Sequence, residues 1–131
     1  MTTWTWMLIV NLAIPFSLFV IGVVMAKRPP KRINHFCGYR TKRSMKSQAA
    51  WDFANVLIGR IWRVLGLLLL VPYTALMLGF LKASEETVLT VGMALCGCSL
   101  ALLLTTPIFV ERKLKYLFDE NGDASAKEDD M

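Results

Sequence analysis

The side chains of this chain that could do chemistry lie in a polar, basic segment, residues 34–55, between two apolar runs. Its sequence is NHFCGYRTKRSMKSQAAWDFAN. Gly38 permits a tight or left-handed backbone turn. Arg40 follows with a planar fork of N–H donors that suits phosphate or carboxylate, and the hydroxyls of Thr41 and Ser44 are placed to orient this charge and cap a helix. These residue types predict either a binding site for an anionic group or an anchor at a membrane surface.

The second half of the segment adds two large polar side chains on one helix face. Trp51 and Asn55 are four residues apart and are therefore neighbours on a helix, where we expect Trp51 to fix the depth and Asn55 to bond across a bundle. In the anchoring interpretation, Tyr39 and Trp51 belong to an interfacial aromatic belt, and Asn55 is only a helix–helix contact. The predicted pocket at the inner membrane surface has eight members: Asn34, Gly38, Tyr39, Arg40, Thr41, Ser44, Trp51 and Asn55.

Catalytic and metal-binding residues are few. An enzyme at the membrane surface would use His35, Arg40 and Asp52, but this is the chain's one histidine, and the segment has no paired carboxylates and no nucleophile with an evident base. The three cysteines are an odd number without a second pair, which favours helix packing over a disulfide or metal site. We expect a non-enzymatic protein without a cofactor or metal. The alternatives are a membrane-embedded enzyme acting on a lipid or peptide and a small transporter subunit.

The elements that must position these residues are membrane spans. The chain has 131 residues, of which 55% are hydrophobic. Three apolar segments, 4–26, 61–81 and 88–110, approach or exceed the roughly 18–20 residues needed to cross a hydrocarbon core of ~30 Å. We therefore predict an all-α integral membrane bundle of three transmembrane helices, forming one domain over residues 1–118, followed by an acidic, flexible tail over 119–131.

A fourth helical element is predicted before the second span. Ser44 is a suitable N-cap, and a single helix from there to Leu81 would be ~57 Å long at 1.5 Å per residue, far more than the hydrocarbon core. We therefore expect an amphipathic helix over residues 44–56, lying at the cytoplasmic interface and bending near Gly59 into the span. A polar stripe that begins in this helix and continues into the span consists of Gln48, Asp52, Asn55, Gly59 and Arg63.

Charge placement predicts the topology. Eight Lys or Arg and no acidic residue lie between Lys27 and Lys46, whereas the turn at 82–87 has one Lys and two Glu. The positive-inside rule then places the N-terminus outside and the C-terminus in the cytoplasm. Because topology and lipid headgroups account for this charge, we expect no nucleic acid partner. Small residues of the third span predict a packing seam within the bundle or a homo-oligomer: Gly92, Ala94, Cys96, Gly97, Cys98, Ser99 and Ala101.

The polar segment resembles the N...GYRT..SM...W..AN signature of the SdpI family of bacterial membrane proteins. The matching positions are Asn34, residues 38–41, residues 44–46, Trp51 and residues 54–55. Pro107, the basic residues after it and the sequence LFDENG resemble the C-terminal end of that family. The resemblance implies a protein of the bacterial cytoplasmic membrane, of the immunity type, that gives resistance to a secreted antibacterial peptide. The partners it implies are membrane lipids, a peptide toxin and a cytoplasmic repressor protein.

Overall fold

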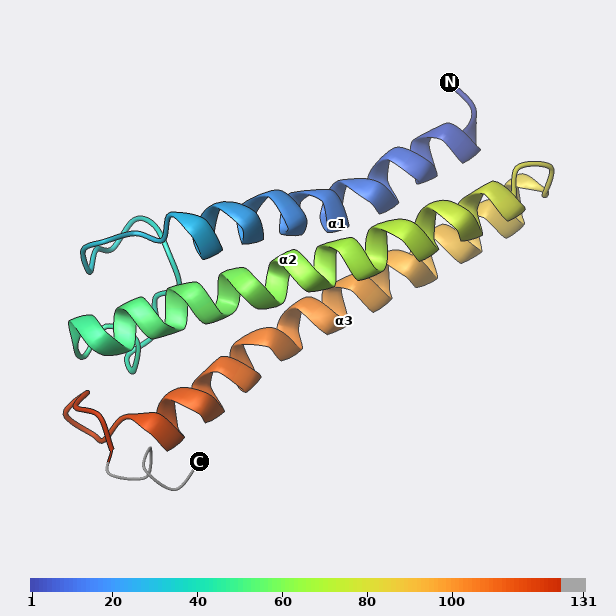
Figure 1. Ribbon diagram of the computed structural model, residues 1–131. Coiled ribbons are helices and arrows are strands. Elements are labelled where there is room, and N and C mark those ends of the chain that lie inside the picture. The colour runs from blue at the N-terminus through green and yellow to red at the C-terminus, as the bar shows by residue number, and fades with distance from the viewer. Residues whose placement is uncertain (126–131) are drawn as a thin grey trace.

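Three long helices that alternate in direction make up the protein (Figure 1). The computed structural model describes residues 1–125, in which α1 spans Thr3–Lys27, α2 spans Gln48–Gly79 and α3 spans Glu85–Leu117. Each helix is long and apolar enough to cross a membrane, judged by length and composition. The predicted all-α class with three candidate membrane spans is therefore confirmed.

Each helix begins at a hydroxyl side chain that accepts a hydrogen bond from the first helical turn. Thr2 caps α1, Ser47 caps α2 and Ser84 caps α3. Such caps satisfy one of the N–H groups that a helix start leaves without a partner. The prediction of Ser44 as the cap of α2 was wrong by three residues, because the Ser44 hydroxyl is buried in the preceding turn and bonds to that turn instead.

The separate interfacial helix over residues 44–56 is not present. Residues 48–79 form one continuous α2, and Gly59 lies inside it. The physical reason is that this half of α2 is covered by protein: Ala50, Ala54 and Ile58 are fully buried and belong to a cluster with Val110 and Leu114 of α3. A helix whose apolar face is already covered has no need to lie on lipid.

Glycines bring α1 and α2 into close backbone contact. A Cβ atom at Gly59 would lie 2.6 Å from the backbone nitrogen of Ala26, and one at Gly66 would lie 2.6 Å from the carbonyl oxygen of Pro15. Gly22 meets the backbone of Arg63 in the same manner. Small residues at helix crossings allow the close approach on which packing within membranes depends. The α1–α2 pair is therefore built on glycines of both helices.

The small residues of α3 lie only partly inside the bundle. Gly92 packs against Met7 and Asn11 of α1, and Ser99 is buried against Tyr73 of α2. Gly97 has no other atom within 4 Å of a Cβ position, and Ala94, Cys98 and Ala101 are exposed. The predicted seam thus forms in part within the bundle, and a homo-oligomer through its exposed part stays a prediction.

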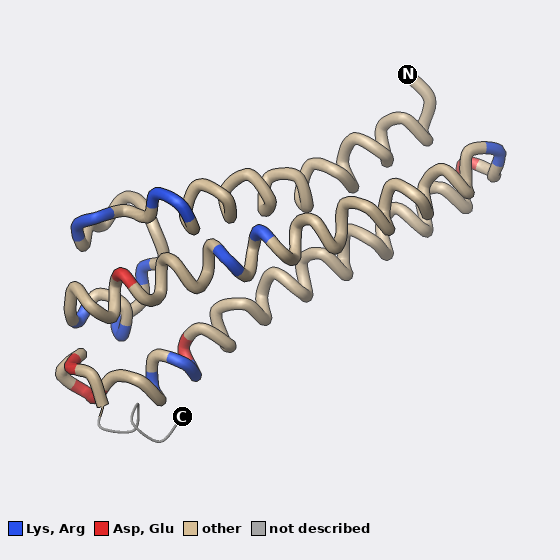
Figure 2. The backbone as a smooth tube through the Cα atoms, viewed as in Figure 1, with Lys and Arg blue, Asp and Glu red and all other residues tan. Residues whose placement is uncertain are grey.

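Positive charge gathers at one end of the bundle (Figure 2). We call this the basic end; it contains the α1–α2 loop, residues 28–47, and the C-terminal part of α3. Helices α2 and α3 have 32 and 33 residues and are roughly 50 Å long, which exceeds the ~30 Å hydrocarbon core. We expect the excess length to lie at the basic end, whose cytoplasmic location remains a prediction from charge.

We expect Gly59→Ala to lower the stability of the protein by about 1–3 kcal/mol, because the new methyl group must displace the α1 backbone. Gly97→Ala is the matched control, since it adds the same methyl group in open space and should leave stability unchanged or raise it by up to about 1 kcal/mol through helix propensity. Thermal unfolding of the full chain in detergent measures both. Equal unfolding temperatures for the two variants would contradict the glycine contact.

Candidate functional site

The α1–α2 loop folds back onto α2 at Gly38. This residue has φ +101°, a conformation that favours glycine. A Cβ atom here would also lie 2.6 Å from Asn55 Oδ1 and 3.2 Å from Trp51 Cη2. Both the backbone angle and the available space therefore require a residue without a side chain at position 38.

Asn55 holds the loop in this place. Its Oδ1 accepts a hydrogen bond of 2.7 Å from the backbone N–H of Tyr39, and its Nδ2 donates to the carbonyl oxygen of Trp51 at 2.9 Å. The side chain is fully buried, so both ends of the amide are satisfied by protein. Trp51 is also fully buried and donates from Nε1 to the Pro30 carbonyl at 2.7 Å. Both side chains thus lie beneath the loop and bond to its backbone.

The Tyr39 side chain connects the loop to α3. Its hydroxyl donates to Glu111 Oε1 at 3.0 Å and lies 3.2 Å from the Pro107 carbonyl oxygen. Burial is the main reason that the pKa of Tyr39 is raised above its usual 10.0, and the hydrogen bond with Glu111 and the charge of that carboxylate raise it further. The phenol is therefore a protonated donor throughout the physiological range.

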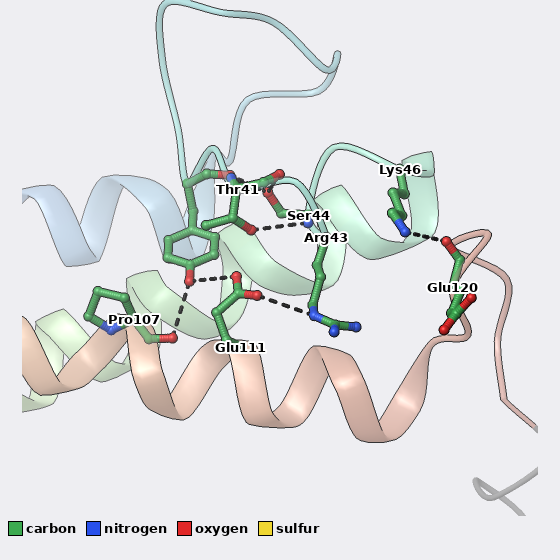
Figure 3. A network of polar contacts seen from close by, with 8 residues as sticks. Thr41, Arg43, Ser44, Lys46, Pro107, Glu111 and Glu120 are labelled. Carbon is green, nitrogen blue, oxygen red and sulfur yellow. Dashed lines mark hydrogen bonds and ion pairs between the residues drawn. The ribbon is translucent and has the colours of Figure 1, made fainter.

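Glu111 joins Tyr39 to a second loop residue. Its Oε2 lies 3.7 Å from Arg43 Nε, so each carboxylate oxygen has a partner from the loop (Figure 3). Sequence reasoning missed Glu111. Its negative charge could have drawn attention to it, because Glu111 is an acid directly followed by Arg112 and Lys113 at the end of the third apolar segment.

Thr41 and Ser44 close a tight turn after Tyr39. The Thr41 N–H donates to Ser44 Oγ at 2.8 Å, and the Ser44 N–H donates to Thr41 Oγ1 at 3.2 Å. The buried Ser44 hydroxyl lies 2.9 Å from the Tyr39 carbonyl oxygen, to which it donates. This exchange keeps both hydroxyls within the loop, where they shape the backbone around Tyr39.

The remaining two predicted residues lie on the outside of the loop. Arg40 is exposed and donates from Nη1 to the His35 carbonyl. Asn34 closes a turn of its own, because its Oδ1 accepts from the N–H groups of Phe36 at 2.9 Å and Cys37 at 2.8 Å. The structure thus brings Gly38, Tyr39, Trp51 and Asn55 together and leaves Asn34 apart from them.

A groove opens beside the loop between α1 and α3. It has a volume of about 570 Å³ and is lined by Ile21 and Val24 of α1, Trp62 of α2, Pro107 of α3 and loop residues 37–41. We call the part of the groove that is lined by loop residues 37–41, which include Arg40 and Thr41, its mouth. A second hollow of about 370 Å³ shares Ile21 and Trp62 with the first and continues along α1 to Ala13. We call the two hollows together the lateral groove.

The C-terminal residues of the described part contact the start of α2. Lys46 donates from Nζ to the Glu120 carbonyl, as Figure 3 shows, and the Ser47 hydroxyl donates to the Gly122 carbonyl. Gly122 has φ +85° and closes a turn in which Asp119 accepts from two backbone N–H groups. Residues 119–125 of the predicted flexible tail thus pack on the loop, and residues 126–131 lie outside the described part of the chain.

Residues 1–125 contain no group of three or more His, Cys, Asp or Glu side chains placed to hold a metal ion. The three cysteines are free. Cys37 is exposed in the loop, and Cys96 Sγ lies 3.4 Å from Asn11 Oδ1 within the helices.

Comparison with known proteins identifies relatives. The model of the SdpI/YfhL protein family matches residues 31–110, which include the loop residues 37–41, all of α2 and most of α3. The chain is also 29% identical over 111 residues to a Bacillus subtilis (strain 168) protein named "Uncharacterized protein YfhL", covering 84% of this chain and 91% of that one. No solved structure matches the chain.

We expect Asn55→Ala to release the loop, because the buried N–H of Tyr39 loses its acceptor at a cost of about 1–3 kcal/mol. Trypsin should then cut after Arg40 about 5–30 times faster, as an opening equilibrium shifted by 1–2 kcal/mol implies. Cys37→Ala is the control, since this thiol is an exposed loop side chain. Cleavage of Asn55→Ala at the wild-type rate would contradict the anchoring role of Asn55.

Proposed function

Because the chain belongs to the SdpI/YfhL protein family, we propose that it is a non-enzymatic bacterial membrane protein of the immunity type. It gives resistance to a secreted antibacterial peptide, or signals the presence of that peptide, by binding a ligand at the mouth of the lateral groove. The membrane character rests on the three helices that are long and apolar enough to span.

One observation carries this proposal. The loop that resembles the family signature is held against α2 through Gly38 and Asn55, and its residues Arg40 and Thr41 line an apolar groove. Binding sites combine an apolar hollow with a few oriented polar groups, and a preformed site avoids the entropic cost of ordering. A loop that served only as an anchor would need neither the groove nor the fixed turn.

A catalytic role has less support. Glu111 is an acid beside the groove mouth, and its two oxygens are engaged by Tyr39 and Arg43. His35 is exposed and contributes its backbone carbonyl to the Arg40 contact. A nucleophile with an adjacent base, which covalent catalysis requires, is not found among these residues.

Signalling has a structural route from the groove to the C-terminal turn. The loop that forms the mouth continues directly into Lys46 and Ser47, which hold the turn through the carbonyls of Glu120 and Gly122. A ligand that shifts the loop would change these contacts at the basic end. A cytoplasmic protein, such as a repressor, would bind to the surface formed by the loop and the turn, and its affinity would change with these contacts.

We expect Arg40→Lys to reduce resistance by about tenfold or more, because lysine keeps the charge but loses the planar fork, and a charge-assisted hydrogen bond contributes about 1.5–3 kcal/mol. Growth of a bacterial host that lacks family members, expressing each variant and challenged with a panel of secreted antibacterial peptides, measures the effect. Lys42→Arg is the control for a charge in the same loop. Membrane level and unfolding temperature should be unchanged in both variants. Wild-type resistance in both Arg40→Lys and Asn55→Ala would contradict a binding site in the loop and would leave it only an anchoring role.

A further inference from the structure

We propose that the lateral groove binds one anionic phospholipid of the membrane leaflet at the basic end, with an acyl chain along α1 and the phosphate at Arg40. The inference rests on the proposed function, since it names the ligand class of the same site. The depth of the groove, the side chains that line it and the charge at its mouth each support a lipid ligand.

The depth of the groove matches one leaflet. Its α1 residues run from Ala13 to Met25, which is a rise of roughly 18 Å at 1.5 Å per residue. Half of a hydrocarbon core of ~30 Å is about 15 Å. If the hydrocarbon core begins at Trp4, about twenty residues of α1 cross it, and the core ends near Val24. Val24 lines the groove together with loop residues 37–41. The groove therefore extends from the headgroup level to about the midplane of the bilayer.

The lining of the groove suits a hydrocarbon chain. Its walls below the mouth are Val20, Ile21 and Val24 of α1 and Leu103 of α3. Two polar side chains lie below the mouth: Trp62, whose Nε1 donates to Thr106 Oγ1 at 3.1 Å, and the single hydroxyl of Ser17 on α1. An extended peptide in this position would bury backbone N–H and C=O groups without enough partners, at several kcal/mol each. An acyl chain has no such groups.

The charge at the mouth suits a phosphate. Arg40 is the one charged residue among those that line the described groove, and its contact with the His35 carbonyl orients the guanidinium while leaving other N–H donors exposed. The nearby carboxylate of Glu111 is engaged by Tyr39 and Arg43. A guanidinium fork binds phosphate oxygens in pairs, and the surrounding loop carries no acidic residue between Lys27 and Lys46. This electrostatic field favours an anionic over a zwitterionic headgroup.

Native mass spectrometry of the purified, delipidated full chain in detergent tests the inference. We expect one phosphatidylglycerol per chain, bound about tenfold more tightly than phosphatidylcholine. Ile21→Trp fills the middle of the groove and should abolish this binding. Val71→Trp is the matched control, because Val71 is 63% exposed on α2 away from the groove, and it should retain the lipid. Arg40→Gln, an exposed substitution that does not depend on repacking, should lower phosphatidylglycerol affinity to that of phosphatidylcholine.

The lipid assignment would be overturned by equal affinity for the two lipids or by equal binding by the two tryptophan variants. Full competition by glycerol 3-phosphate, which has the headgroup phosphate without acyl chains, would also overturn it. A peptide retained in the groove in place of lipid would do the same. If lipid binding fails while Arg40→Lys still loses resistance, only the ligand class is wrong. If lipid binds as expected and resistance never depends on the chain, the immunity proposal fails and the lipid site stands.

Discussion

The hydrogen bond from the Tyr39 backbone to the buried side chain of Asn55 is the contact on which the basic end depends. A backbone N–H group that is buried within the protein must find its acceptor in the protein, because leaving it unpaired costs free energy. Asn55 provides this from within α2, and Gly38 leaves the space for its oxygen. After this turn, the Tyr39 hydroxyl contacts Glu111 of α3, and Arg40 lines the groove mouth.

The lateral groove follows from unequal helix packing. Glycines of α1 and α2 bring these two backbones into contact from the middle of the bundle toward the basic end, at Gly66, Gly22 and Gly59. Helix α3 has its own close glycine contact with α1 at Gly92, beside Met7 and Asn11 near the other end. Larger side chains, including Trp62 and Pro107, occupy the space between α1 and α3 toward the loop. They do not fill it, and the groove remains.

Glu111 links α3 to the α1–α2 loop through contacts with Tyr39 and Arg43. Arg112 and Lys113 follow it in the sequence, and Arg43 Nε lies 3.7 Å from its Oε2, so these cations stabilise its charge. Because its oxygens contact Tyr39 and Arg43, it joins α3 to the loop. The loop is thus held by both α2 and α3, and the Arg40 side chain is exposed. Such preorganisation is what a site needs to recognise a ligand with little entropic cost.

The sequence by itself determined the three spans, the concentration of positive charge at one end and the segment from which the loop is built. These properties are sums over neighbouring residues, so composition and length suffice to predict them. Only the tertiary structure decided that Ser47 caps α2, that α2 continues through Gly59, that Asn55 bonds to Tyr39 and that Glu111 engages the loop. Each of these depends on which atoms lie opposite one another across helices. That is set by the rotation and offset of packed helices, which no single segment contains.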